Sequence, residues 1–131
     1  MNQHVRYLGV SPSTEAFPLS GSTASSVAIL ITGTTAAAQT TAHTCDANAW
    51  DAPYIRIDNV SAASVTVYGN IGSTATTGNR AWTIAAGSFA VAYSYEVMQS
   101  GAGVFGFWAS ATAGIYVSGN VARYYTASSA P

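Results

Sequence analysis

The sequence contains no lysine and very few charged residues of any kind. Four arginines stand against five acidic residues, so charged residues make up 7% of the chain and the formal net charge is -1. In ordinary soluble domains roughly a quarter of the residues are charged. A surface with so little charge must consist mainly of Ser, Thr, Ala, Gly, Asn, Gln and Tyr, and it gives almost no electrostatic repulsion between copies. The composition therefore favours a protein that packs against other molecules.

The shortage of basic residues disfavours nucleic acid as a partner. Phosphate contacts are made chiefly by Lys and Arg, and the four arginines are dispersed among the acidic residues. The longest unbroken apolar runs, 27–31 and 89–93, are far shorter than the roughly 18 residues that a membrane-spanning helix requires. We therefore expect neither a nucleic-acid partner nor a membrane partner.

The chain also lacks a second cysteine. Cys45 is the only one, so no intramolecular disulfide can form and the disulfide-stapled secreted class is excluded. The segment 1–7 carries Arg6 but is not followed by the apolar stretch of a secretory signal. We expect synthesis in a cytoplasm without processing.

What the chain does contain is apolar material arranged with a period of two. Hydrophobic residues make up 49% of the sequence, which is enough for one core in a chain of 13.4 kDa. In 54–60, Ile55 and Ile57 fall on one face, and Tyr54, Arg56 and Asp58 on the other. This alternation predicts a half-buried strand.

Further segments with strand character are separated by turn-rich stretches of Gly, Ala, Ser, Thr and Asn. In 88–97 the alternation places Phe89, Val91, Tyr93 and Tyr95 on one face and small residues on the other. The best helical segment, 36–39, is too short to stand as a helix. The sequence predicts an all-β fold, an antiparallel β-sandwich of the jelly-roll or Ig-like type with about eight strands. The expected strands are 26–32, 40–45, 54–60, 64–70, 82–84, 88–97, 104–108, 115–118 and 121–126.

The two ends of the chain differ in composition from the middle. Residues 1–25 are polar, contain Pro and Ser, and carry only scattered apolar anchors. We expect an extended N-terminal arm over 1–25, a β-sandwich domain over 26–126 and a C-terminal tail over 127–131. The arm orders on a partner or lies on its own domain, and the sequence leaves both alternatives open.

Residues suited to chemistry do not form a convincing site. His43 and Cys45 share a strand face and can reach one metal ion, but two ligands do not make a site, and His4 would have to join them from the N-terminal segment. The alternative is an ordinary buried thiol at a polar strand end. Nothing in the spacing of the carboxylates favours an acid and base pair. We predict no metal site, no cofactor and no catalytic residues, and therefore no enzyme.

The aromatic residues are expected in the core or in an interface, since Tyr and Trp are enriched among interface hot spots. A Trp and Tyr platform for stacking sugar rings is the alternative. Arginine would supply ion pairs to an acidic partner surface. The predicted interface residues are Arg6, Tyr7, Phe17, Trp50, Arg56, Tyr93, Tyr95 and Tyr124.

Three short stretches carry a family resemblance. Ile-Arg-Ile-Asp-Asn-Val-Ser at 55–61 precedes Val-Thr-Val-Tyr-Gly at 65–69, a polar loop, and Trp-Thr-Ile-Ala-Ala-Gly-Ser at 82–88. This rhythm resembles that of β-sandwich virion proteins, and the small Ala/Ser/Thr/Gly-rich chain resembles the cement or decoration proteins of tailed bacteriophage capsids. The resemblance implies a virion protein on the capsid surface, made in the host cytoplasm, that binds the major capsid protein as a homodimer or homotrimer and reinforces the shell.

Two other classes of binding protein remain as alternatives. A carbohydrate- or receptor-binding β-sandwich module would bind a glycan and lose that binding when a single Trp is replaced. A self-assembling fibre or surface-layer subunit would form long arrays without a shell.

Overall fold

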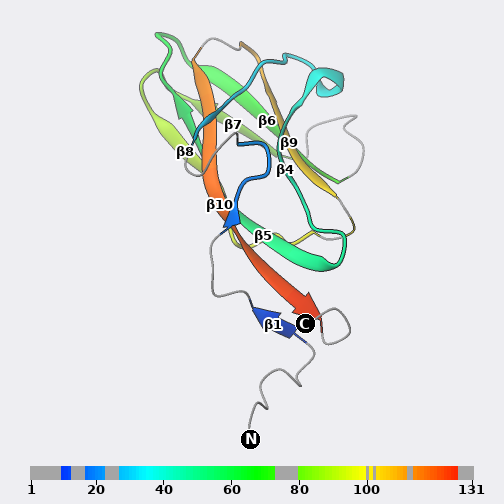
Figure 1. Ribbon diagram of the computed structural model, residues 1–131. Helices are drawn as coiled ribbons and strands as arrows, with labels where there is room; N and C mark the ends of the chain where they lie inside the picture. Colours follow the sequence, from blue (N-terminus) through cyan, green and yellow to red (C-terminus); the bar gives the residue numbers. More distant parts are fainter. Residues whose placement is uncertain are drawn as a thin grey trace, which may run out of the picture.

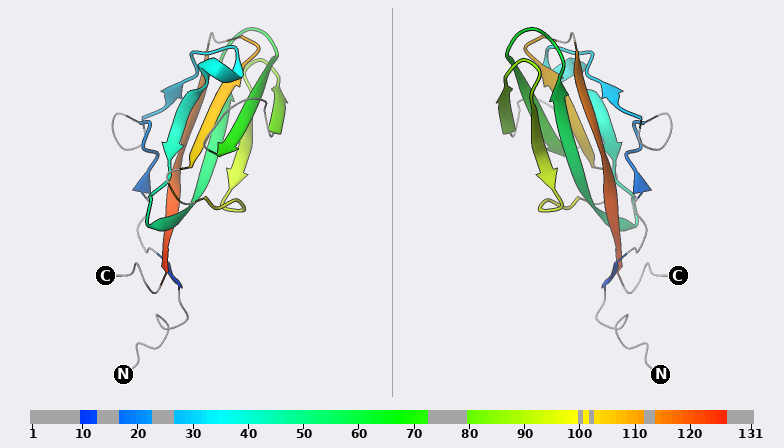
Figure 2. Two further views of the ribbon diagram at one scale, coloured as in Figure 1. Left: turned by 90° about the vertical axis from the view of Figure 1, so that its right-hand side faces the viewer. Right: turned by 90° about the vertical axis from the view of Figure 1, so that its left-hand side faces the viewer.

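The computed structural model describes residues 10–12, 17–22, 27–72, 80–99, 101, 103–111 and 114–126. These residues form two antiparallel β-sheets packed face to face, which confirms the predicted all-β sandwich (Figures 1 and 2). The segment that the sequence shows to be too short for a helix forms a single turn of 3-10 helix, Ala36–Ala38. No helix among the described residues is long and apolar enough to cross a membrane.

The larger sheet is built around one long pair of strands. β10 (Ile115–Thr126) runs antiparallel to β5 (Ala49–Asn59), and their pairing extends from Ile115 opposite Asn59 to Tyr125 opposite Ala49. β8 (Phe89–Ser94) pairs with the other flank of β5. The free flank of β10 pairs with three short strands from the N-terminal part of the chain, β1 (Val10–Pro12), β2 (Phe17–Pro18) and β3 (Ile29–Leu30).

The smaller sheet has four strands in the order β4, β9, β6, β7. Their bounds are Thr40–Thr44 for β4, Val104–Ala109 for β9, Val65–Gly72 for β6 and Arg80–Ile84 for β7. β6 and β7 are consecutive neighbours in this sheet, whereas every other connection from β3 to β10 crosses between the sheets. The resulting order, β3-β10-β5-β8 over β4-β9-β6-β7, is the double-sheet arrangement of a jelly roll.

The core lies between the inner faces of the two sheets. Ile55 and Ile57 of β5 are fully buried there, as the period of two predicts. The smaller sheet contributes Val67, Phe105 and Phe107, which are also fully buried. Because inward residues at the centre of both sheets are fully buried, the strand register is fixed and the outward residues can be assigned with it.

β10 is one strand where the sequence predicts two. Gly119 and Asn120 read as a break between 115–118 and 121–126, but both lie inside the strand. Gly119 has φ 157°, and a Cβ atom there would lie 1.8 Å from the carbonyl oxygen of Tyr54. The glycine therefore allows β10 to pass close to β5 instead of ending the strand.

Part of the segment predicted as an arm packs on its own sandwich. Phe17–Pro18 pairs with β10, and Leu19, which follows it, is 1% exposed and belongs to the core. The backbone N–H of Ser20 donates to His43. Residues 17–22 are thus part of the sandwich, while 1–9, 13–16 and the predicted tail 127–131 lie outside the described residues.

Candidate binding face of the larger sheet

The outer face of the larger sheet carries large side chains that the fold leaves uncovered. Alternation from the buried Ile55 and Ile57 defines which residues point outward, and the pairing adds those of β8 and β10. Phe89 is 53% exposed and Trp50 is 42% exposed. The outward residues of these three strands are Trp50, Tyr54, Arg56, Asp58, Phe89, Val91, Tyr116, Ser118, Asn120 and Tyr124.

The outer face of the smaller sheet differs in character. Thr66 and Thr83 hydrogen-bond to each other there, with 3.0 Å between their hydroxyl oxygens. Tyr68 stacks on Trp108 with 5.6 Å between ring centroids, and Trp108 is only 6% exposed. Aromatic rings are therefore covered on the smaller sheet and open on the larger one, which makes the larger sheet the candidate binding face.

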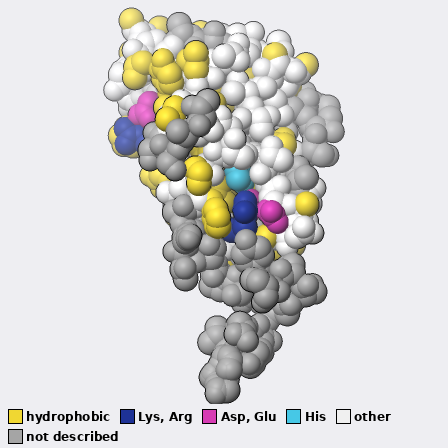
Figure 3. Space-filling model, viewed as in Figure 1, with side chains coloured by type: hydrophobic (Ala, Val, Ile, Leu, Met, Phe, Trp, Pro, Cys, Tyr) yellow, Lys and Arg dark blue, Asp and Glu magenta, His cyan; other side chains and the backbone are white. Residues whose placement is uncertain are grey.

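The charges of the described residues largely neutralise one another. Figure 3 shows charged side chains gathered in small groups, with hydrophobic and uncharged side chains over most of the viewed face. Arg56 pairs with Asp58 at 2.8 Å on the outer face, within one strand and not across two. Arg80 lies 3.6 Å from Glu96. The binding face therefore presents almost no net charge to a partner.

Four of the predicted interface residues lie on or beside this face. Trp50, Arg56 and Tyr124 point outward from its strands, with Tyr124 directly opposite Trp50 in the register. Tyr95 follows β8 and is 45% exposed. Arg123 of β10 points instead to the inner side of the sheet, where it pairs with the buried Asp51.

Of the other predicted interface residues, two lie outside the described residues and one points toward the inside of the sandwich. Arg6 and Tyr7 lie outside the described residues. The guanidinium carbon of Arg123 lies 4.5 Å from the ring centroid of Phe17, so Phe17 contacts its own sandwich.

Tyr93 is a core residue, and its prediction as an interface residue is corrected by the structure. It is 1% exposed and meets Phe105 edge-on at 5.3 Å between centroids. The reason is a β-bulge, because Tyr93 pairs with Ile55 while Val91 pairs with the next residue, Arg56. The extra residue in β8 turns Tyr93 to the face opposite Val91, so the alternation predicted for 88–97 does not hold.

Tyr95 is held in an unusual backbone conformation. Its φ of 64° lies in the left-handed region, and no other described non-glycine residue has a positive φ. Its N–H donates to the carbonyl of Pro53 at 2.9 Å, its ring lies 5.8 Å from that of Tyr54, and its hydroxyl donates to Oδ1 of Asn120. Such strain persists only where surrounding contacts enforce it, and it is typical of functional sites.

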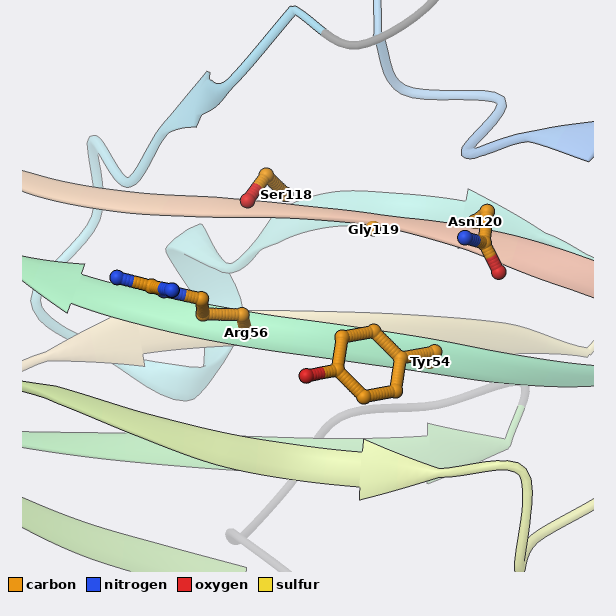
Figure 4. Close-up of a pocket in the computed structure, with 5 residues that line it drawn as sticks. All are labelled: Tyr54, Arg56, Ser118, Gly119 and Asn120. Carbon is orange, nitrogen blue, oxygen red and sulfur yellow. The ribbon is translucent and has the colours of Figure 1, made fainter.

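Beside this tyrosine pair lies an open groove of about 290 Å³. Tyr54 and Arg56 of β5 line one side, and Ser118, Gly119 and Asn120 of β10 line the other (Figure 4). The sequence identified Tyr54 and Arg56 as outward residues but gave no sign of Ser118 and Asn120. Those two positions depend on the pairing of β10 with β5, which is not visible in a linear pattern.

A buried polar network lies on the inner side of the sheet, behind Trp50. Asp51 is 0% and His43 is 1% exposed. Nδ1 of His43 accepts the Ser20 N–H at 3.1 Å, so the Nε2–H donates to Oδ2 of Asp51 at 2.8 Å. Arg123 donates to both Asp51 oxygens, at 2.8 and 3.1 Å, and the Asp46 N–H donates to Oδ2 at 3.0 Å. The network ties β4, β5, β10 and the segment after β2 together.

Asp51 is a residue that the sequence reasoning missed. The alternation that buries Ile55 and Ile57, continued backwards past Pro53, already places Asp51 on the inner face. A carboxylate there requires a partner, because a buried unpaired charge is strongly unfavourable. Burial acts to raise the pKa of Asp51, but hydrogen bonds from His43, Arg123 and Asp46 outweigh it and hold the pKa well below its usual value.

The same region contains the candidate metal ligands. His43, Cys45 and Asp51 bring one ligand atom each to within 4.8 Å of one another, which adds Asp51 to the pair found in the sequence, while His4 lies outside the described residues. A cation would have to displace the His43 proton and compete with Arg123 for Asp51. Burial, with a smaller contribution from the Asp51 charge, raises the pKa of the Cys45 thiol to about 12. The arrangement is that of a structural hydrogen-bond network beside a protonated thiol.

The protein is a jelly-roll sandwich in which the outer face of the larger sheet is open, aromatic and nearly uncharged. Comparisons of the chain with protein-family models, with curated proteins and with solved structures give no significant match. Function must therefore be inferred from the residues of this face and from the composition of the chain.

Proposed function

We propose that the chain is a non-enzymatic structural virion protein that binds the outside of a bacteriophage capsid. It is made in the host cytoplasm, associates as a homodimer or homotrimer, and reinforces contacts between major capsid subunits. Its action requires no cofactor. Jelly-roll domains occur in viral capsid proteins and in lectins, so the fold is compatible with this role by analogy alone.

The observation that carries the proposal is the exposed aromatic patch at the Trp50 end of the larger sheet. Trp50 is 42% exposed and lies directly opposite Tyr124 on the same face. Met98 is 40% exposed and precedes Gln99, which bridges to Asp51 beside Trp50. Indole and phenol rings at the centre of a contact are the side chains most often responsible for binding energy. The patch is therefore suited to dock on a protein surface.

The composition supports the same role. A copy held on a shell meets its neighbours at high effective concentration, so individually weak contacts act together. The low net charge of -1 produces little repulsion between such copies. A chain that had to remain dispersed in solution would be expected to carry more charge.

The test is binding of the purified protein to capsids assembled from the major capsid protein of the same virus. Trp50→Ser is expected to weaken binding by about thirtyfold, because a central hot-spot side chain contributes about 2 kcal/mol. Binding is measured by co-sedimentation across a concentration series.

Val60→Ser is the matched control. Val60 is 67% exposed but follows the opposite end of β5, roughly 33 Å from Trp50 at about 3.3 Å per residue. It should bind as the unchanged protein does. Equal binding by the Trp50→Ser protein and the unchanged protein would contradict the assignment of the patch.

A further inference from the structure

The groove between β5 and β10 contains polar groups with no partner among the described residues. The Tyr54 hydroxyl, the Ser118 hydroxyl and the Asn120 amide nitrogen all lack one, whereas Oδ1 of Asn120 accepts the Tyr95 hydroxyl. In Figure 4 the side chains of Tyr54 and Asn120 lie beside each other across the strand pair. The groove thus combines an aromatic wall with hydrogen-bonding groups that are free to meet a ligand.

The ligand cannot be bound as an added β-strand. β10 and β5 are both inner strands of the larger sheet, since β10 also pairs with β1, β2 and β3 and β5 also pairs with β8. Neither strand therefore has a free edge along the groove long enough to pair with an added strand, and recognition must come chiefly from side chains. This argues against an extended peptide.

The ligand should also be uncharged. Among the described residues that line the groove, only Arg56 is charged. Its Nε–H donates to Oδ1 of Asp58 at 3.0 Å, its Nη2 lies 2.8 Å from the same oxygen, and its guanidinium lies 3.9 Å from the Phe89 ring centroid. The neighbouring carboxylate neutralises the arginine, so the groove offers no net attraction for an anion.

We propose that the groove binds a pyranose ring of a neutral carbohydrate, stacked against Tyr54, whose ring lies against that of Tyr95. A sugar ring presents an apolar face to an aromatic ring and a rim of hydroxyls to groups such as those of Ser118 and Asn120. The volume of about 290 Å³ is near the lower limit of small-molecule sites, roughly 300 Å³. It suits one or two rings.

The strained backbone of Tyr95 supports this assignment. Its φ of 64° places the ring beside Tyr54 and the hydroxyl on Asn120, so two lining residues are held in position before a ligand arrives. Preorganisation of this kind lowers the entropic cost of binding.

The carbohydrate site is separate from the patch proposed for capsid binding. Tyr54 lies four residues from Trp50 along β5, roughly 13 Å at about 3.3 Å per residue. The capsid contact is tested by Trp50→Ser and the groove by Ser118→Leu, so failure of one proposal is distinguishable from failure of the other.

The test uses the purified full chain on a microarray of neutral and sialylated saccharides, followed by calorimetric titration of each saccharide that binds. We expect saturable binding of neutral hexopyranose-containing saccharides. Tyr54→Ala should raise the Kd at least about tenfold, whereas Tyr54→Phe, which keeps the ring, should raise it less. Ser118→Leu, which fills the groove from β10 without removing the ring, should also weaken binding about tenfold or more.

Tyr68→Ala removes a tyrosine ring from the other sheet, where Tyr68 stacks on Trp108, and should leave the Kd unchanged. Thermal unfolding of each variant verifies that it is folded. The proposal is overturned if no neutral saccharide binds, if only sialylated ones bind, or if a folded Ser118→Leu protein binds as the unchanged protein does.

Discussion

Asp51→Asn is expected to lower the free energy of unfolding by about 3 kcal/mol at pH 7, with a fall in the unfolding midpoint of roughly 10 °C. Asp51 is fully buried and accepts hydrogen bonds from Arg123, His43 and the backbone of Asp46. An amide in its place removes the fully buried counterion of Arg123, with the Asp46 carboxylate 4.0 Å away, and turns two N–H groups toward other donors. Chemical denaturation followed by tryptophan fluorescence measures the loss.

Asp58→Asn is the matched control, since it makes the same change on the same strand. The Arg56–Asp58 pair lies on the outer face, with its side chains 44% and 29% exposed. Ion pairs at such positions contribute at most about 1 kcal/mol. If the two variants lose equal stability, the buried Asp51 network contributes no more to folding than the exposed Arg56–Asp58 pair.

The same network determines how stability responds to acid. The pKa of Asp51 is lower in the folded protein than its ordinary value of 3.8, so the unfolded chain takes up this proton first as pH falls. The stabilisation is complete above the ordinary value and is lost as pH falls from there toward the folded pKa. The difference between the unchanged protein and Asp51→Asn should therefore be largest near neutral pH and shrink below about pH 4.

Gly119→Ala should destabilise the protein by about 3 kcal/mol or more, since it forces an atom between two paired inner strands. The added Cβ would lie 1.8 Å from the Tyr54 carbonyl oxygen and 3.1 Å from the Cα of Ile55. Relief requires β10 to move away from β5 at the centre of the larger sheet. The expected result is a large loss in the free energy of unfolding, together with loss of the groove.

Gly72→Ala is the control, because it places alanine in a glycine conformation without creating a clash. Gly72 has φ 130°, and a Cβ atom there would meet nothing within 4 Å. It should lose only about 1 kcal/mol, the cost of placing alanine in a glycine conformation. A loss at Gly119 no larger than that at Gly72 would show that the close approach of the strands is not what requires glycine.

The sandwich was predictable from the sequence because the inward residues of its central strands are buried. Ile55 and Ile57 on β5, and Val65 and Val67 on β6, alternate with polar residues, and the structure buries all four. A period of two over such segments leaves little choice of register. The choice of jelly roll over Ig-like topology was not predictable, because it depends on which distant strands pair.

The binding face could be predicted only in part, for two physical reasons. A β-bulge between Val91 and Tyr93 reverses the alternation within β8, and a single extra residue of this kind leaves no signal in a pattern of apolar residues. The groove needs Ser118 and Asn120 opposite Tyr54 and Arg56, a relation between segments some sixty residues apart in the sequence. Strand pairing over that separation is decided by the whole fold.

The most direct test of the proposed capsid role is an electron cryomicroscopy reconstruction of capsids assembled without this protein, compared with the same capsids after the purified chain is added. The account predicts additional density on the outside of the shell, in dimers or trimers over the junctions between major capsid subunits, with the Trp50 end of the larger sheet against the shell. Identical reconstructions with and without the added protein would contradict it.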